Sequence, residues 1–342
     1  MNRIFRTLAF LTLTGVLGCS PKAEKQIITV NGPIPASTLG IALSHEHVLV
    51  DFIGADSTGY HRWDREEVAN RVLPYLTEIK QYQVKALMEC TPAYLGRDPW
   101  LLRTLSSKSG LHIITNTGFY GAHANSYIPS EFLQLTAEDL SGIWVDEFLN
   151  GIEGSGVKPG FIKIGVDSDE MLSREHLKLI TAAGLAHKQT GLVIASHTGP
   201  DGPALEQIKV LKSLDINPSA FIWVHAQRGS LEGNIKAAEM GSWISLDNVN
   251  PNLPEGSAFD VSWYAERILD LKEAGYLNRL LISHDAGWYK PEEENGGTFR
   301  GFTGIFTALI PELEKNGFSQ ADLKLLLEVN PANAFYVRPV YK

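Results

Sequence analysis

The segment Ile41-Ala-Leu-Ser-His-Glu-His47 begins as an apolar run and ends in two histidines separated by one residue. Side chains alternate along a β-strand, so His45 and His47 are expected to point to the same face. Imidazole is a common ligand of zinc-like ions. A single buried histidine is more often a hydrogen-bonded core residue, so this strand alone is weak evidence for a metal site.

Four later segments repeat the pattern of an apolar run that ends in a metal-type side chain. They are Gly160-Phe-Ile-Lys163, Leu192-Val-Ile-Ala-Ser-His197, Phe221-Ile-Trp-Val-His225 and Leu280-Leu-Ile-Ser-His-Asp285. Five such strand ends are difficult to attribute to chance. The pattern therefore predicts that these side chains meet at one metal centre.

Short β-type runs alternate with segments of helical period along most of the chain. Strands are expected near residues 41–48, 85–91, 112–119, 160–166, 192–197, 221–226, 242–247 and 279–285, and helices over 65–83, 99–109, 145–151, 173–190, 204–214, 231–240 and 259–274. Repeated βα units imply a parallel sheet. Eight of them indicate an α/β fold of the TIM (β/α)8 barrel type, with the site at the C-terminal ends of the strands. A doubly wound open sheet is the alternative, although it would place its ligand at one switch point.

The composition is that of a globular protein, with 44% hydrophobic and 20% charged residues in 342. No low-complexity linker divides the chain, so residues 27–342 are expected to form a single barrel domain. The formal net charge of −9 argues against nucleic acid as a partner and predicts no polybasic patch for anionic lipid.

Residues 1–18 have the pattern of a lipoprotein signal peptide, in which Arg3 and Arg6 precede a mostly apolar run. Val16-Leu-Gly-Cys19 resembles a bacterial lipobox, so Cys19 is the expected lipidation site and residues 19–26 a polar tether. An exported lipoprotein, periplasmic or on the cell surface, would touch the bacterial membrane through its lipid only. A plain signal peptide with a chance cysteine is the alternative. Cys90 would then have no disulfide partner.

The histidine pair at the end of the first strand, together with Lys163, His197, His225 and Asp285, resembles the phosphotriesterase family of the amidohydrolase superfamily. The resemblance extends from about Ile27 to Val337. It is supported by Thr117-Gly-Phe-Tyr120, by Ser319-Gln-Ala-Asp-Leu and by Asn330-Pro-Ala-Asn-Ala-Phe335.

This resemblance implies two divalent metal ions. One would be held by His45, His47 and Asp285 and the other by His197 and His225, with carboxylated Lys163 and a hydroxide between them. Zinc is the expected metal, and manganese, cobalt or iron would accept similar ligands. The hydroxide would be the nucleophile, and Asp285 would take its proton. An ammonium at Lys163 would be costly among apolar neighbours, which favours the carbamate over the alternative of an ordinary salt bridge.

Three residues are candidates for binding substrate: Tyr120, Arg228 and Trp288. The resemblance implies that Tyr120 orients the bridging solvent or the leaving oxygen, and the alternative is a packing role. Family members commonly have acidic residues after the second-metal histidine, but here His225 is followed by Ala-Gln-Arg228. Arg228 suits a carboxylate or phosphate of the substrate, or else a pairing with Asp247 or Glu89.

Trp288 belongs to residues 286–302, which are expected to form a lid hinged at Gly296-Gly297, with a disordered acidic loop as the alternative. Asp247 is expected to relay a proton or to serve in a turn or salt bridge. The other histidines are not expected to be metal ligands; they are His61, His112, His123, His176, His187 and His284. His61 and His123 lie in loops at the expected active face.

We therefore expect a binuclear metal-dependent hydrolase that attacks an ester bond, with a lactone as the first candidate and a phosphotriester as the second. A mononuclear enzyme that cleaves amides and a non-catalytic ligand-binding surface lipoprotein are the alternatives. Small-molecule esters or lactones are the expected partners, and a homodimer is the state that the resemblance implies.

Overall fold

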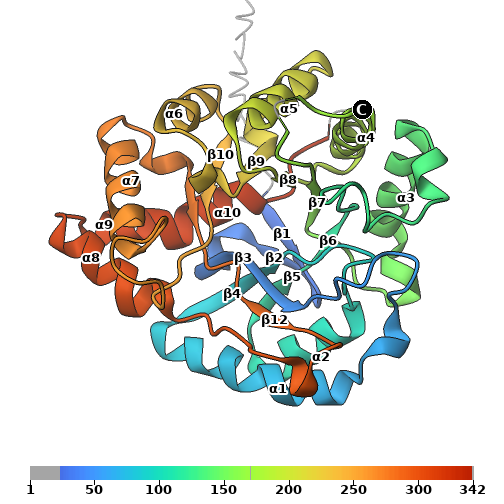
Figure 1. Cartoon of the computed structure of the whole chain (residues 1–342), viewed down its shortest axis with the longest axis horizontal. Coiled ribbons are helices and arrows are strands. Elements are labelled where there is room, and N and C mark those ends of the chain that lie inside the picture. Colours follow the sequence, from blue (N-terminus) through green and yellow to red (C-terminus); the bar gives the residue numbers. More distant parts are fainter. Residues whose placement is uncertain (1–23, 170, 341–342) are drawn as a thin grey trace, which may run out of the picture.

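The computed structural model describes residues 24–169 and 171–340. The expected signal peptide and Cys19 lie outside these residues. The described chain forms a closed barrel of parallel strands surrounded by helices (Figure 1). The predicted α/β fold class is confirmed.

The barrel wall consists of ten short strand segments that form eight positions, since β5 and β6 continue one another and β12 extends the path of β11. They are β3 (Ile41–Leu49), β4 (Val84–Glu89), β5 (His112–Ile114), β6 (Asn116–Thr117), β7 (Phe161–Gly165), β8 (Ile194–His197), β9 (Phe221–Val224), β10 (Trp243–Leu246), β11 (Leu280–Ile282) and β12 (Gly287–Tyr289). All neighbouring pairs are parallel, and β12 pairs with β3 to close the barrel.

The helices pack around this wall (Figure 1). They are α1 (Arg65–Glu78), α2 (Pro99–Ser109), α3 (Ala137–Asn150), α4 (Arg174–Thr190), α5 (Asp201–Ser213), α6 (Leu231–Glu239), α7 (Val261–Glu273), α8 (Ile310–Lys315), α9 (Gln320–Lys324) and α10 (Asn330–Phe335). The expected helix 145–151 is the second half of α3. The helix starts earlier because Thr136 and Asp139 form a capping box that bonds the first backbone N–H groups.

The barrel interior is apolar below the strand ends. Ala86, Met88, Val193 and Ile222 belong to this inner cluster, and Phe335 of α10 joins it, with its ring 5.3 Å from that of Phe161. A fully buried side chain of this size contributes about 1.5–3 kcal/mol. The six predicted metal ligands line a cavity at the other end of the barrel, where the strands end.

Two strand regions were not predicted from the sequence. An antiparallel hairpin of β1 (Gln26–Thr29) and β2 (Gly32–Pro35) precedes the barrel, so Gln26 begins a strand. The expected lid begins with β12, which belongs to the barrel wall. Gly296 is required for close packing, since a Cβ there would lie 2.2 Å from the Tyr289 ring. Tyr289 in turn donates a 2.6 Å hydrogen bond to Glu67 of α1.

None of the helices in the described ranges has the length and apolar character that a bilayer span requires.

Candidate metal centre

The first strand of the barrel presents two imidazoles to the cavity at the C-terminal strand ends. The Nε2 atoms of His45 and His47 lie 3.2 Å apart, and Asp285 Oδ1 lies 3.1 Å from His47 Nε2 and 3.6 Å from His45 Nε2. Ligand atoms around one tetrahedral zinc ion are roughly 3.3 Å apart, given bonds of about 2.0–2.1 Å. The spacing of these three atoms therefore fits one divalent ion.

The opposite nitrogens of the two imidazoles are already engaged. His45 Nδ1 lies 2.9 Å from Asp247 Oδ2, and His47 Nδ1 lies 2.8 Å from Thr91 Oγ1. A carboxylate only accepts hydrogen bonds, so the proton of neutral His45 must be on Nδ1 and its Nε2 must carry a lone pair. The Nε2 lone pair of His45 and the carboxylate of Asp285 thus converge on one point, an arrangement that suits a bound cation.

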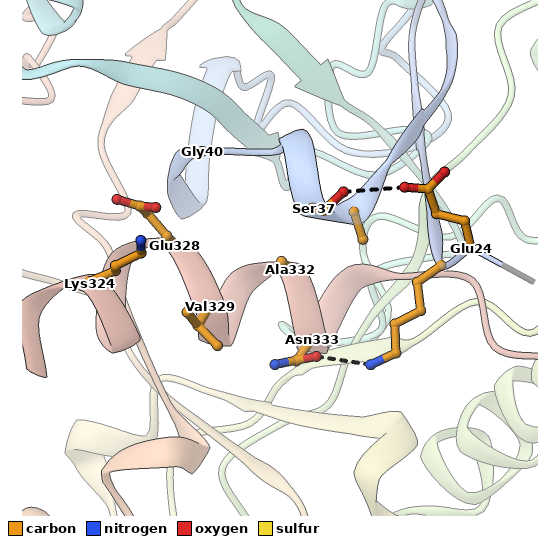
Figure 2. Close-up of a pocket in the computed structure, with 10 residues that line it drawn as sticks. Glu24, Ser37, Gly40, Lys324, Glu328, Val329, Ala332 and Asn333 are labelled. Atoms are coloured by element: carbon orange, nitrogen blue, oxygen red, sulfur yellow. Dashed lines mark hydrogen bonds between the residues drawn. The ribbon is translucent and has the colours of Figure 1, made fainter. Parts of the chain in front are cut away.

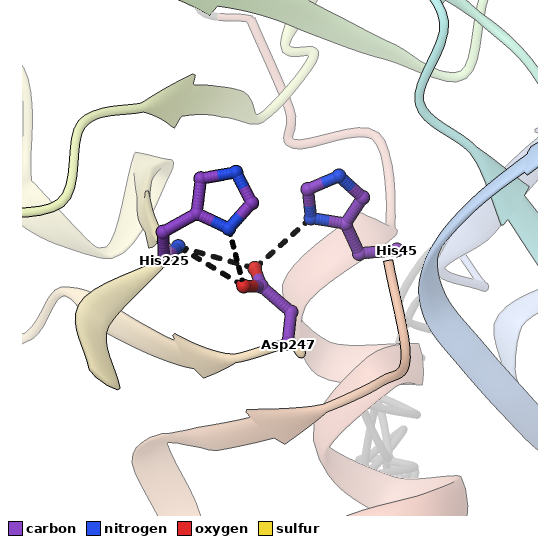
Figure 3. Close-up of side chains that lie close together, drawn as sticks. All are labelled: His45, His225 and Asp247. Carbon is purple, nitrogen blue, oxygen red and sulfur yellow. Dashed lines mark hydrogen bonds and ion pairs between the residues drawn. The ribbon is translucent and has the colours of Figure 1, made fainter. Parts of the chain in front are cut away.

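Asp247 links the two histidines that stand on opposite sides of the expected metal pair. Its Oδ1 lies 2.7 Å from His225 Nδ1 while its Oδ2 contacts His45, as Figure 3 shows. Asp247 is fully buried, and Ser245 Oγ donates to Oδ2 at 2.7 Å. Such outer carboxylates set the tautomer and orientation of metal-binding histidines.

His197 and Lys163 complete the cavity from neighbouring strands. The His197 ring centroid lies 4.4 Å from that of His225, and Lys163 is 2% exposed. Within the described ranges Lys163 forms no ion pair, so the salt bridge considered for it is not seen there. His45, His47, Lys163, His197, His225 and Asp285 all line one cavity of about 140 Å³.

The electrostatics favour the protonation states that metal ligands need. Burial, aided by Lys163, lowers the pKa of His45 to about 4. Burial and the nearby His225 and Lys163 hold the pKa of His197 well below its ordinary value. Burial alone would raise the pKa of Asp285, but the surrounding histidines lower it below its usual range. Neutral imidazoles and an ionised carboxylate are therefore available at neutral pH.

His225 behaves differently, because Asp247 outweighs burial and raises its pKa above the ordinary value. Asp247 itself has a pKa far below the usual range, since His225 and His45 overcome the opposing effect of burial. A metal ion at His225 would take the place of the proton that this carboxylate favours.

Four cavity residues have left-handed backbone conformations that non-glycine residues rarely adopt. They are His123 (φ 57°), His225 (φ 61°), Asp285 (φ 50°) and Trp288 (φ 71°). Each costs of order 1–3 kcal/mol, and such strain gathers at functional sites. Arg300 stabilises this backbone by donating to the carbonyl oxygens of His284 and, at 2.6 Å, of Asp285. Sequence analysis did not identify Arg300, because no local pattern marks its contact with Asp285.

The proposed substrate residues take different positions. Tyr120 and Trp288 line the cavity, and the Tyr120 ring lies 5.0 Å from that of His197. Arg228 is exposed, is absent from the cavity lining and forms no ion pair with Asp247 or Glu89. Gln227 contacts Asp247 instead, at 3.3 Å.

The remaining histidines do not join the predicted ligand set. His123 lines the cavity, whereas His61 does not. His176 bonds the carbonyl of Gly121, and His284 bonds Glu46 at 2.6 Å on the other side of β3. His284 therefore points away from the cavity, as strand alternation predicts.

A (β/α)8 barrel with these two histidine and aspartate clusters, His45-His47-Asp285 and His45-His225-Asp247, is typical of a metal-dependent hydrolase. The profile of the Phosphotriesterase family matches residues 25–335. This chain belongs to the phosphotriesterase family and is a metal-dependent hydrolase.

Three relatives illustrate the range of the family. The phosphotriesterase homology protein of Escherichia coli K12 is 27% identical over 303 residues, covering 86% of this chain and 98% of that protein. An aryldialkylphosphatase of Saccharolobus solfataricus is 27% identical over 313 residues, covering 88% and 96%. The N-acetyltaurine hydrolase of Rattus norvegicus is 24% identical over 343 residues, covering 90% and 96%. These names span phosphoester and amide chemistry.

Proposed function

We propose that this chain hydrolyses lactones with two divalent metal ions, zinc in the first instance. His45, His47 and Asp285 would hold one ion, His197 and His225 the other, and Lys163, carboxylated, would bridge them. Bound ions would lower the pKa of water towards about 7 and polarise the oxygen of the scissile group. The observation that carries this proposal is the convergence of the His45, His47 and Asp285 acceptor atoms on one cavity.

Asp285 is the proposed proton acceptor. Its carboxylate is ionised at neutral pH and is 17% exposed at the cavity, so it can take a proton and release it to solvent. Asp247 is poorly placed to pass this proton to solvent, because it is fully buried and already accepts hydrogen bonds from several donors. We assign Asp247 the task of orienting His45 and His225.

Tyr120 is the proposed hydrogen-bond donor to substrate. Burial, with the Asp285 charge next in size, raises the pKa of Tyr120 well above its ordinary value, so the phenol keeps its proton. A neutral phenol can donate to an oxygen that gains negative charge as a carbonyl is attacked.

The apolar wall of the cavity suits the carbon skeleton of a lactone. Phe52, Leu95 and Trp288 line it, and the rings of Phe52 and Trp288 lie 5.5 Å apart. Apolar walls with a few polar groups are the usual form of small-molecule sites. Phosphotriester hydrolysis is the second candidate, supported by the aryldialkylphosphatase relative.

Arg228 supports a third candidate, hydrolysis of an amide that carries an anionic group. Its guanidinium is exposed in the turn after β9, beside Gly199, where a Cβ would lie 3.4 Å from Arg228 Cδ. The relative named N-acetyltaurine hydrolase acts on such a compound. Arg228 is the proposed recognition group for a substrate anion in this case and in the case of a polar lactone.

The test combines metal analysis with turnover. Wild type and Lys163→Ala are assayed for bound metal and for hydrolysis of a lactone panel, an activated phosphotriester and N-acetyltaurine, with exposed Lys85→Ala as control. We expect two metals per chain and lactone turnover that only Lys163→Ala abolishes. Two metals with no turnover of any substrate would favour a binding protein, and one metal with unchanged activity would overturn the binuclear mechanism.

We also propose that the protein is an exported lipoprotein attached through Cys19, and that it forms a homodimer as the family resemblance implies. The sequence pattern of residues 1–19 supports the first point. Cys19→Ser should move the protein from the membrane fraction to the soluble fraction, and light scattering of the released protein measures its oligomeric state.

A further inference from the structure

A second polar pocket lies at the opposite end of the barrel from the metal centre. It encloses about 350 Å³ where β9, β10 and β11 begin. Asn278 and Arg279 come from the turn before β11, Asn333 from α10 and Arg338 from the C-terminal segment, and Lys25 precedes β1. These five residues are here called the cationic pocket.

The cationic pocket gathers three cations in a chain whose net charge is −9. No carboxylate lines it, and Lys25, Arg279 and Arg338 form no ion pair within residues 24–169 and 171–340. The nearby Glu24 is bonded to Ser37 at 3.3 Å, in the adjoining pocket that Figure 2 shows. The positive charge in this pocket is therefore not neutralised by the described residues.

The three cations are positioned by aromatic rings and amides. Lys25 Nζ lies 4.3 Å from the centre of the Tyr336 ring, and Arg338 Cζ lies 5.1 Å from the same ring. Lys25 also donates to Asn333 Oδ1 at 3.0 Å, and Asn333 is labelled in Figure 2. Arg279 Cζ lies 5.3 Å from the centre of the Trp243 ring.

Arg338 and Arg279 differ in how their donors are used. Arg338 donates to the carbonyl oxygens of Ala334, Tyr336 and Ser219, so it has a structural task in holding the C-terminal segment. Arg279 is half-buried, and its guanidinium has no hydrogen-bond acceptor among the described residues. Its donors are thus available to a ligand.

Like charges in a partly buried pocket repel, and an anion relieves that repulsion. Burial, together with the neighbouring Arg279, lowers the pKa of Arg338 to about 10. Guanidinium groups pair with phosphate through two parallel hydrogen bonds, and amides such as Asn278 add neutral donors.

We infer that the cationic pocket binds a phosphate group, carried either by a small soluble phosphate ester or by the headgroup of an anionic lipid. Lys25 follows Cys19 by six residues, which span at most about 20 Å when extended. A lipid on Cys19 would bring lipid headgroups within reach of this end of the barrel. The metal centre, at the other end, would then face away from the membrane.

The test uses the full chain with bound metals and three probes: inorganic phosphate, glycerol 1-phosphate, and vesicles of phosphatidylcholine with or without phosphatidylglycerol. Binding is measured by calorimetry and by co-sedimentation for wild type, Arg279→Gln, Lys25→Gln and the exposed control Arg174→Gln. We expect Arg279→Gln to weaken phosphate binding at least about tenfold, Lys25→Gln to weaken it less, and Arg174→Gln to leave it unchanged. Hydrolase activity should be the same in all four proteins.

The vesicle probe distinguishes the two sources of phosphate. Stronger sedimentation with phosphatidylglycerol that is reduced in Arg279→Gln relative to Arg174→Gln assigns a lipid headgroup, and binding of glycerol 1-phosphate without this difference assigns a soluble ester. Phosphate bound only at the metal centre would be insensitive to Arg279→Gln. That result, or no binding of any probe, would overturn the inference.

Discussion

The two faces of strand β3 both carry buried polar side chains, but the hydrogen bonding of these side chains differs. On one face, His45 and His47 direct their Nε2 atoms at each other and at Asp285, across the cavity. On the other, Glu46 is fully buried and accepts hydrogen bonds from Ser283 Oγ at 2.7 Å, from His284 Nδ1 at 2.6 Å and from the backbone N–H groups of His284 and Ala286 at 3.0 Å. Burial alone therefore does not mark a site, whereas metal-type ligand atoms that converge on one cavity do.

Asp285→Asn should have the largest effect on activity. It should leave the stability contributed by the Glu46 face of β3 unchanged. Removing the carboxylate charge should lower kcat/KM by about 10³-fold or more, because it takes away both the proposed metal ligand and the proposed proton acceptor. Steady-state kinetics on the best substrate and metal analysis measure this, with exposed Asp270→Asn as control. Unchanged turnover, or a large loss of thermal stability with metals retained, would break the distinction between the two faces.

Glu46→Gln should produce the reverse result. Leaving His284 without its charged partner should lower the free energy of unfolding by about 3 kcal/mol, while the metal content at neutral pH stays that of wild type. Burial alone would raise the pKa of Glu46, but His284 lowers it below the ordinary value. The stabilisation is therefore present above the ordinary glutamate pKa of about 4.3 and is lost as the pH falls below it.

Urea unfolding of wild type and Glu46→Gln at a series of pH values checks this expectation. The difference in unfolding free energy should shrink as the pH falls. A variant of wild-type stability that has lost its metals would instead make Glu46 part of the metal centre.

The loss of metal affinity or activity in Asp247→Asn should lie between those in Asp285→Asn and Glu46→Gln. Asp247 orients the imidazoles of His45 and His225, and loss of such outer carboxylates typically lowers metal affinity or activity about 10–100-fold. Competition with a chelator measures the affinity, and thermal melting of the metal-free protein gives the structural contribution. If only the melting temperature changed, Asp247 would resemble Glu46 rather than a support of the metal ligands.

Arg300→Lys should have the smallest effect. An ammonium cannot reach the carbonyls of His284 and Asp285 and the Asn248 amide together, so the strained Asp285 backbone loses support. We expect kcat to fall about 3–10-fold with KM unchanged, consistent with about 1 kcal/mol of lost hydrogen bonding. Equal kinetics for Arg300→Lys and wild type would show that β12 and its pairing with β3 hold Asp285 without this contact.

Much of the barrel was predictable because its signals are local. The eight expected strands appear within a few residues of their predicted positions, since an apolar run of strand length is visible in the sequence. The hairpin β1–β2 was not predicted, although the β-branched run Ile27 to Val30 followed by Asn31-Gly32 is a typical hairpin signal. The first half of α3 was missed although Thr136 and Asp139 signal its start, and helices α8 to α10 were not predicted.

The candidate ligands of the site could be predicted from the sequence, but the residues that hold them in place could not. The six expected ligands stand at strand ends, so the fold class brings them to one cavity. Glu46, Arg300 and Gln227 act through contacts with residues far along the chain, and their roles depend on strand register. A one-residue shift of that register would reverse the faces of β3.

The sequence alone determined the order of the βα units and the metal-type side chains at the strand ends, because periodicity and alternation are properties of neighbouring residues. Tertiary structure decided which nitrogen of each histidine faces the cavity, and which buried carboxylate supports it. It also gathered Lys25, Arg279 and Arg338 into one pocket, where composition predicted no basic patch. Contacts between residues hundreds of positions apart arise from packing, and local sequence carries no signal for them.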